Sequence, residues 1–230
     1  MRAALLAFLL GSALLLAADQ GDPRFEKWLD QSRKIFAANH LIAYVRLAHI
    51  DSKKGAPFEF RYDRYPDGLE RVQNSAGVAL AHKKGKKWLE SHDWGETGDE
   101  VDPDVAKQTE GMINYVNIPL ANKHKSKDMS QGAVVVRMVD QRTTKEGNEE
   151  IDFEQGREHQ TGVNYPKFTF FRFKDAKPDD VVLSQFSGPV YDAGGGRVQV
   201  NVRYEYMVAV KMDETNVKVV TPPPSPSPSH

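Results

Sequence analysis

Histidine is the residue type in this sequence best suited to bind a metal or transfer a proton, and it occurs seven times. No two histidines form a His-Glu-x-x-His motif, in which one helical turn places both rings on a single zinc ion. His92-Asp93 and Glu158-His159 are pairs in which a ring and a carboxylate are adjacent. Polar residues at hairpin surfaces produce the same pairs, and this simpler interpretation is favoured. We therefore expect no metal site.

Nucleophilic chemistry is also poorly supported. The sequence contains no cysteine, which excludes disulfides, thiolate zinc sites and a cysteine nucleophile. No serine lies in a Gly-x-Ser-x-Gly motif. Glu149, Glu150, Asp152 and Glu154 form an acidic group, but a catalytic carboxylate pair needs burial that this polar stretch does not favour. We expect a protein without enzymatic activity and without a cofactor, and a hydrolase is the least favoured alternative.

Glycine-rich and basic segments offer two further options. Gly194-Gly195-Gly196 precedes a predicted strand rather than a helix, so a hairpin loop is favoured over a phosphate-binding loop. The basic hairpin from His82 to Trp88 could contact anionic headgroups at a membrane surface or acidic partners. A solvated turn is the favoured alternative.

Aromatic side chains are the remaining candidates, because they bind through apolar contact. Five of them are predicted to contact a ligand: Trp28, Phe36, Phe58, Phe60 and Trp88. The same side chains would make an ordinary β-sheet core. From the residues alone the core interpretation is favoured, and both interpretations stay open here.

The two ends of the chain differ in composition from its middle. Residues 1–18 have a short basic start, an apolar stretch and small residues before a polar switch, which predicts a cleaved signal peptide and a periplasmic or secreted protein. An uncleaved membrane anchor is the alternative. Residues 221–230 are a Pro/Ser tail predicted to be disordered, and residues 19–220 are predicted to form a single α+β domain. The net charge of −1 gives no electrostatic case for binding nucleic acid.

Periodicity predicts the elements of that domain. Residues 22–39 form an amphipathic helix, with Asp22 as N-cap and Pro23 in the first helical position. Strict alternation predicts strands at residues 58–63 and 198–210. A weak apolar stripe predicts a second helix at residues 104–115. Short runs separated by turns elsewhere indicate nine or ten antiparallel strands. We expect a large curved antiparallel β-sheet, an open half-barrel, with both helices packed on its concave face and an apolar cavity between them.

The block from Trp28 to Trp94 resembles the N-terminal half of the LolA/RseB-like envelope proteins. It has an opening amphipathic helix, then Phe58-Glu59-Phe60-Arg61-Tyr62-Asp63-Arg64-Tyr65-Pro66, then Leu69-Glu70-Arg71-Val72 and Lys86-Lys87-Trp88-Leu89-Glu90-Ser91. The family's usual Asp-Gly before the aromatic strand is Lys84-Gly85 here, and the C-terminal half has no counterpart. The resemblance implies an unclosed barrel lidded by helices, whose interior holds acyl chains, and no functional residue carries over.

Two functions follow as predictions. The first is an exported periplasmic protein that binds or carries an apolar ligand, such as a lipid or a lipoprotein acyl chain, without catalysis. The second is an envelope protein–protein interaction module with a filled core, in which the proline tail and the basic hairpin make the contacts.

Overall fold

The computed structural model describes residues 22–50, 57–74, 79–84, 87–90, 98–121, 134–157, 165–191, 196–207 and 219–220. Several predicted features lie outside these residues. They are the signal peptide, the Pro/Ser tail, both His–carboxylate pairs, most of the basic hairpin's side chains, and Gly194 and Gly195. Within the described ranges, no helix is both long enough and apolar enough to span a bilayer.

Both predicted helices are present, and an aspartate serves as the N-cap of each. Helix α2 spans Pro23–Ala38, and the Asp22 side chain accepts the Arg24 backbone N–H at 3.0 Å. Helix α3 spans Pro103–Asn117 after Asp102, and the 3-10 helix η2, Ile118–Leu120, follows it. In both helices proline occupies the first turn, where its missing N–H costs no hydrogen bond. The cap and proline predicted for the first helix are therefore confirmed. The second helix, predicted over residues 104–115, is also present, and it begins at Pro103, which the sequence had placed in the preceding loop.

Eleven strands form one antiparallel sheet in the described chain. Ten of them follow one another across it in the order β5-β4-β3-β2-β1-β10-β9-β8-β7-β6, and β11 pairs with β10. The sheet is not closed, since β5 and β6 are its two edges. The predicted α+β class with an open antiparallel sheet is confirmed. The strands are β1 (His40–His49), β2 (Phe58–Arg64), β3 (Glu70–Asn74), β4 (Ala79–Lys84), β5 (Lys87–Leu89), β6 (Val134–Thr143), β7 (Glu149–Arg157), β8 (Lys167–Arg172), β9 (Val182–Tyr191), β10 (Arg197–Met207) and β11 (Val219–Val220).

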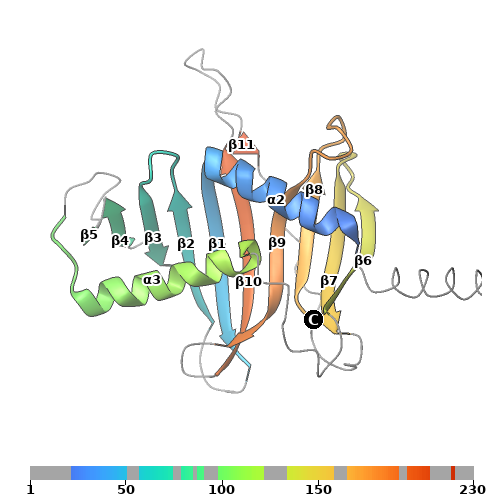
Figure 1. Ribbon diagram of the computed structural model, residues 1–230. Helices are drawn as coiled ribbons and strands as arrows, with labels where there is room; N and C mark the ends of the chain where they lie inside the picture. Colours follow the sequence, from blue (N-terminus) through green and yellow to red (C-terminus); the bar gives the residue numbers. More distant parts are fainter. Residues whose placement is uncertain are drawn as a thin grey trace, which may run out of the picture.

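Both helices lie on one side of the sheet, which we call the helix face (Figure 1). Helix α2 runs across β9 and β8, and α3 runs across the strands from β4 to β1. We call the side without helices the opposite face. A strand places successive side chains on alternate faces, so each strand contributes to both surfaces.

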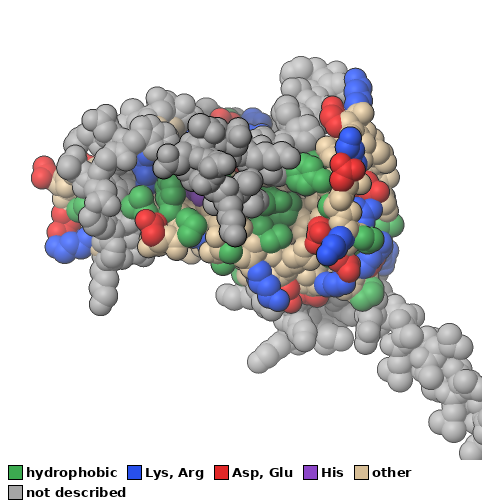
Figure 2. Space-filling model, turned by 90° about the horizontal axis from the view of Figure 1, so that it is seen from above, with side chains coloured by type: hydrophobic (Ala, Val, Ile, Leu, Met, Phe, Trp, Pro, Cys, Tyr) green, Lys and Arg blue, Asp and Glu red, His purple; other side chains and the backbone are tan. Residues whose placement is uncertain are grey.

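Strand β7 contains the acidic group that the sequence places in a polar stretch. Ile151 and Phe153 are buried, while Glu150 and Asp152 alternate with them and form ion pairs with Arg142 on β6 at 2.6 and 2.7 Å. The acidic side chains are thus the polar face of a half-buried strand. Figure 2 shows basic and acidic side chains interleaved at this end of the molecule.

Candidate functional site

The five aromatic residues predicted to contact a ligand are spread over α2, β2 and β5. Trp28 and Phe36 lie on α2 and Phe60 lies on β2, and all three belong to the buried core. Trp88 is buried on β5, where its indole nitrogen donates to a glutamate of α3 at 3.3 Å. Phe58, at the start of β2, is 45% exposed.

The contact between α2 and the sheet is packed with aromatic rings. The Trp28 ring centroid lies 5.8 Å from that of Phe153 and 5.7 Å from that of Phe170. Phe36 stacks on Tyr204 at 5.4 Å. A ligand could therefore touch Trp28 or Phe36 only if α2 moved away from the strands. The contact roles of the predicted residues stay a prediction.

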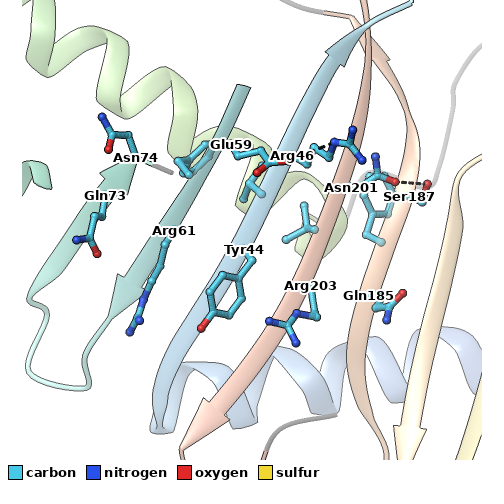
Figure 3. A pocket seen from close by; sticks show the side chains of 14 residues that line it. Tyr44, Arg46, Glu59, Arg61, Gln73, Asn74, Gln185, Ser187, Asn201 and Arg203 are labelled. Carbon is cyan, nitrogen blue, oxygen red and sulfur yellow. Dashed lines mark hydrogen bonds and ion pairs between the residues drawn. The ribbon is translucent and has the colours of Figure 1, made fainter. Parts of the chain in front are cut away.

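A pocket of about 640 Å³ lies on the opposite face, across β3, β2, β1, β10 and β9. Tyr204 packs against Phe36 of α2, so the even-numbered residues of β10 face the helices. Alternation along the strand then directs Asn201 and Arg203 away from the helices. Figure 3 shows Arg61, Tyr44 and Arg203 side by side on neighbouring strands of the pocket.

A row of five side chains crosses the pocket, one from each strand: Gln73, Arg61, Tyr44, Arg203 and Gln185. Strand register creates the row, because Tyr44 is paired with Arg61 on one side and with Arg203 on the other. Those arginines are paired in turn with Gln73 and Gln185. We call its three central residues, Arg61, Tyr44 and Arg203, the Arg–Tyr–Arg row.

The two arginines of this row flank the tyrosine ring. The guanidinium carbon of Arg203 lies 4.5 Å from the Tyr44 ring centroid, and that of Arg61 lies 5.8 Å from it. Cation–π attraction between a guanidinium and an aromatic face operates within about 6 Å. Tyr44 therefore holds both guanidinium groups at the centre of the pocket.

Two buried carboxylates lie on the same face, one register step from the row. Asp63 accepts hydrogen bonds from Arg61 Nε at 2.7 Å and Nη2 at 2.6 Å, and His40 Nε2 lies 3.0 Å from its Oδ1. Glu205 pairs with Arg203 Nη2 at 3.1 Å. Each carboxylate thus fixes one arginine of the row from the side.

Electrostatics at Asp63 follow from this arrangement. Burial raises the pKa of the Asp63 carboxyl, but hydrogen bonds and charge from His40 and Arg61 outweigh burial and bring its pKa below the ordinary value. The hydrogen bond to Asp63 correspondingly raises the pKa of Arg61. The pair is therefore ionised at neutral pH, as a bidentate Arg–carboxylate contact requires.

Further polar side chains line the pocket beside the row. Arg46 Nε lies 3.3 Å from Glu59, and both side chains are more than half exposed. Ser187 Oγ donates to Asn201 Oδ1 at 2.7 Å and accepts from Gln199 Nε2 at 3.0 Å. The dashed line between Ser187 and Asn201 in Figure 3 marks the first of these bonds.

These residues offer hydrogen-bond donors and positive charge around an aromatic ring, which suits ligand binding. Among the residues that the structure describes, no group of three or more His, Cys, Asp or Glu could hold a metal ion. The pocket on the opposite face is thus a candidate binding site. Its polar side chains stand outside the hydrophobic core, whereas four residues of its lining belong to that core: Val45, Phe60, Phe186 and Val202.

Sequence reasoning missed Tyr44, Arg61 and Arg203 as functional residues because it followed the apolar face of each strand. A signal was present. Arg61-Tyr62-Asp63 and Arg203-Tyr204-Glu205 share one pattern, in which arginine and acid lie on one face and tyrosine on the other. What the sequence did not supply was the register that places both tripeptides beside Tyr44.

The fold and site define an open antiparallel sheet with two helices on one face and a polar pocket on the other. No family model and no curated protein matches the sequence. The structure is similar to a LolA superfamily protein from Nitrosomonas europaea, with a TM-score of 0.28, 10% identity and coverage of 78% of this chain and 90% of that one. It is also similar to a domain described as an outer membrane lipoprotein-sorting protein, from Vibrio parahaemolyticus, with a TM-score of 0.21, 9% identity and coverage of 83% and 97%.

These likenesses concern the arrangement of helices and strands alone. The function of this chain has to be argued from its own pocket.

Proposed function

We propose that this chain is an exported, non-catalytic binding or carrier protein for a lipid-type ligand, such as a lipid or a lipoprotein acyl chain with its polar end. The observation that carries this proposal is the pocket of about 640 Å³ across the five central strands. Its size lies within the range of small-molecule sites, which is roughly 300–1,000 Å³.

The lining suits a ligand that is part apolar and part polar. Tyr44 contributes an aromatic ring, and Arg46, Arg61 and Arg203 contribute hydrocarbon stems below charged heads. Burial of one methylene contributes about 0.8 kcal/mol, and a micromolar Kd corresponds to about 8 kcal/mol. We therefore expect ligands whose chains have more than about ten carbons.

Among the five aromatic residues predicted from the sequence, Phe60 is part of the pocket lining. Its side chain alternates with those of Glu59 and Arg61, so it is directed to the helix face, where it is buried in the core. Contact through Phe60, Trp28, Phe36, Phe58 or Trp88 remains a separate prediction.

Occlusion of the pocket tests the proposal. Asn201→Trp places a large ring among the lining residues, and Val139→Trp, on an exposed position of β6, is the matched control. Binding of a long-chain fatty acid is measured by titration, with thermal melts to confirm folding. We expect the wild type and V139W to bind alike and N201W to lose most of its affinity. A wild type that binds no acyl ligand at all would refute the proposal.

A protein-interaction module is the second candidate, and one observation favours it. Strand β6 is an edge of the sheet and exposes Met138 and Val139, which are 40% and 49% exposed. Such an edge can pair with a strand of another chain. Native mass spectrometry of protein purified from its own host separates the two candidates, because a bound lipid supports the carrier and a bound protein without lipid supports the module.

A further inference from the structure

We propose that the Arg–Tyr–Arg row recognises an anionic group, a phosphate or a carboxylate, at the polar end of the ligand. This inference rests on the proposed function and adds the chemical class of the headgroup. The row lies across the middle of the pocket, on the central strands β2, β1 and β10.

The charge of the lining supports an anion. Arg46, Arg61 and Arg203 contribute three positive charges to the pocket wall, and Glu59 is the one acidic residue among those that line it. Glu59 and Arg46 form an exposed ion pair, and such pairs are worth about 0–1 kcal/mol, so a ligand can replace them at little cost.

The carboxylates that balance the row are buried rather than presented to the ligand. The side chains of Asp63 and Glu205 are 3% and 8% exposed, whereas those of Arg61 and Arg203 are 29% and 31% exposed. The acids therefore anchor the guanidinium groups from one side. A guanidinium carries five N–H donors, and Arg203 meets Glu205 through Nη2 at 3.1 Å.

Tyr44 argues against other ligand classes. A sugar ring or a quaternary ammonium group binds an aromatic residue by covering its face. Here the guanidinium groups of Arg203 and Arg61 lie over the Tyr44 ring at 4.5 and 5.8 Å from its centroid. The Tyr44 ring thus holds the two guanidinium groups, and these groups are the ones that contact the ligand. Arginine forks match phosphate and carboxylate oxygens in pairs.

The test compares two ligands with the same acyl chain and different ends: a monoacylglycerol phosphate and the corresponding neutral monoacylglycerol. Affinities for the full-length protein are measured by calorimetry at one fixed salt concentration. We expect the acidic ligand to bind at least about tenfold more tightly, which corresponds to about 1.4 kcal/mol.

The decisive variant is Arg203→Gln combined with Glu205→Gln, because removal of both partners leaves no buried carboxylate unpaired. We expect it to lose the preference for the acidic ligand, so that the two ligands bind the variant with equal affinity. Arg46→Gln, at an exposed position, should reduce the preference in part. Arg137→Gln, on the exposed surface of β6, is the control for R46Q because it removes the same single charge, and it should change neither affinity.

The outcomes separate the two proposals. If both ligands bind the wild type equally and R203Q/E205Q alters neither affinity, the anionic site is refuted while the carrier function stands. If neither acyl ligand binds but inorganic phosphate does, and R203Q/E205Q abolishes that binding, the anionic site is supported and the carrier function is refuted. If nothing binds, both fail.

Discussion

At the scale of single residues, the pocket depends on charged groups, and strand register places their partners beside them. Asp63 lies one register step from the Arg–Tyr–Arg row and binds Arg61 through two nitrogen atoms. Its carboxylate is buried, so it has little water to replace a lost partner. A buried charge without a partner is more costly than an exposed one.

Replacement of Asp63 by asparagine should therefore destabilise the protein. The amide keeps the volume and one acceptor, but it removes the charge that balances Arg61. We expect the free energy of unfolding to fall by roughly 2 kcal/mol, since Arg61 is partly exposed and water can compensate for some of the loss. Urea denaturation at pH 7 measures the change. Asp67→Asn, in the exposed turn after β2, is the control, and an equal loss in both variants would contradict the argument.

The pH dependence of that loss has a definite sign. The pKa of Asp63 is lower in the folded protein than its ordinary value, so the unfolded chain binds the proton more readily. The stabilisation is fully present above the unfolded pKa, which is about 3.9, and is lost as the pH falls through the folded pKa. The difference in unfolding free energy between wild type and D63N should be constant above about pH 5 and shrink below it. A difference that grows on acidification would show that Asp63 carries no such shift.

At the scale of elements, one serine joins α2 to the sheet. Ser32 is buried, its Oγ donates to the Trp28 carbonyl oxygen at 2.7 Å, and it accepts the Leu183 N–H of β9 at 2.8 Å. Leu183 pairs with Phe170 of β8, and the register of β8 and β9 shifts between Thr169 and Phe170. The serine thus satisfies a strand N–H at an irregular point of the sheet.

Ser32→Ala should accordingly cost more than an ordinary serine substitution. It leaves the Leu183 N–H buried without its acceptor, which costs about 1–3 kcal/mol. Lys34→Ala, on the exposed side of the same helix, should change the unfolding free energy by less than about 0.5 kcal/mol. Denaturant titrations measure both values, and hydrogen exchange at Leu183 reports the broken bond directly. Unchanged protection of that amide in S32A would refute the role given to Ser32.

Elements with a local signal were predictable from the sequence. Asp22-Pro23 marks the start of α2, and the alternation of apolar and polar residues in β10 gives its buried face. Strand β7 was not predicted, because its acidic residues, Glu150 and Asp152 among them, resemble a polar loop until Arg142 is placed beside them. A strand with charged residues on its outer face resembles a loop in the sequence, because the opposite charges that balance it lie on a neighbouring strand.

The candidate site was not predictable for a related reason. The sequence indicated which side chains are apolar, and these pack α2 against the strands. The polar row is assembled from two consecutive strands, which carry Tyr44 and Arg61, and from β10, which is far from them in the chain and carries Arg203. Only the pairing of β1 with β10 brings the third of these to the other two.

At the scale of the whole molecule, that pairing joins two halves of the sheet. Strands β5 to β1 and α3 form one half, and β10 to β6 and α2 form the other. Phe36 of α2 packs on Tyr204, and the Tyr204 hydroxyl donates to the Val116 carbonyl oxygen of α3 at 2.8 Å. Arg33 of α2 donates to the Leu120 carbonyl oxygen of η2. The seam is therefore crossed by side chains as well as by the strand ladder.

These connections lead us to expect that both halves unfold in one transition, and two tryptophans can report it separately. Trp28 is buried in the half with α2, and Trp88 in the half with α3. Variants that keep one reporter, W88F/W94F and W28F/W94F, are unfolded in urea while fluorescence and far-UV circular dichroism are recorded. In each variant the fluorescence and dichroism midpoints should coincide, as for a two-state domain. If Trp88 reported an earlier transition than dichroism, the half formed by β5 to β1 and α3 would unfold on its own. The Arg–Tyr–Arg row would then lie on a seam that opens before the core is lost.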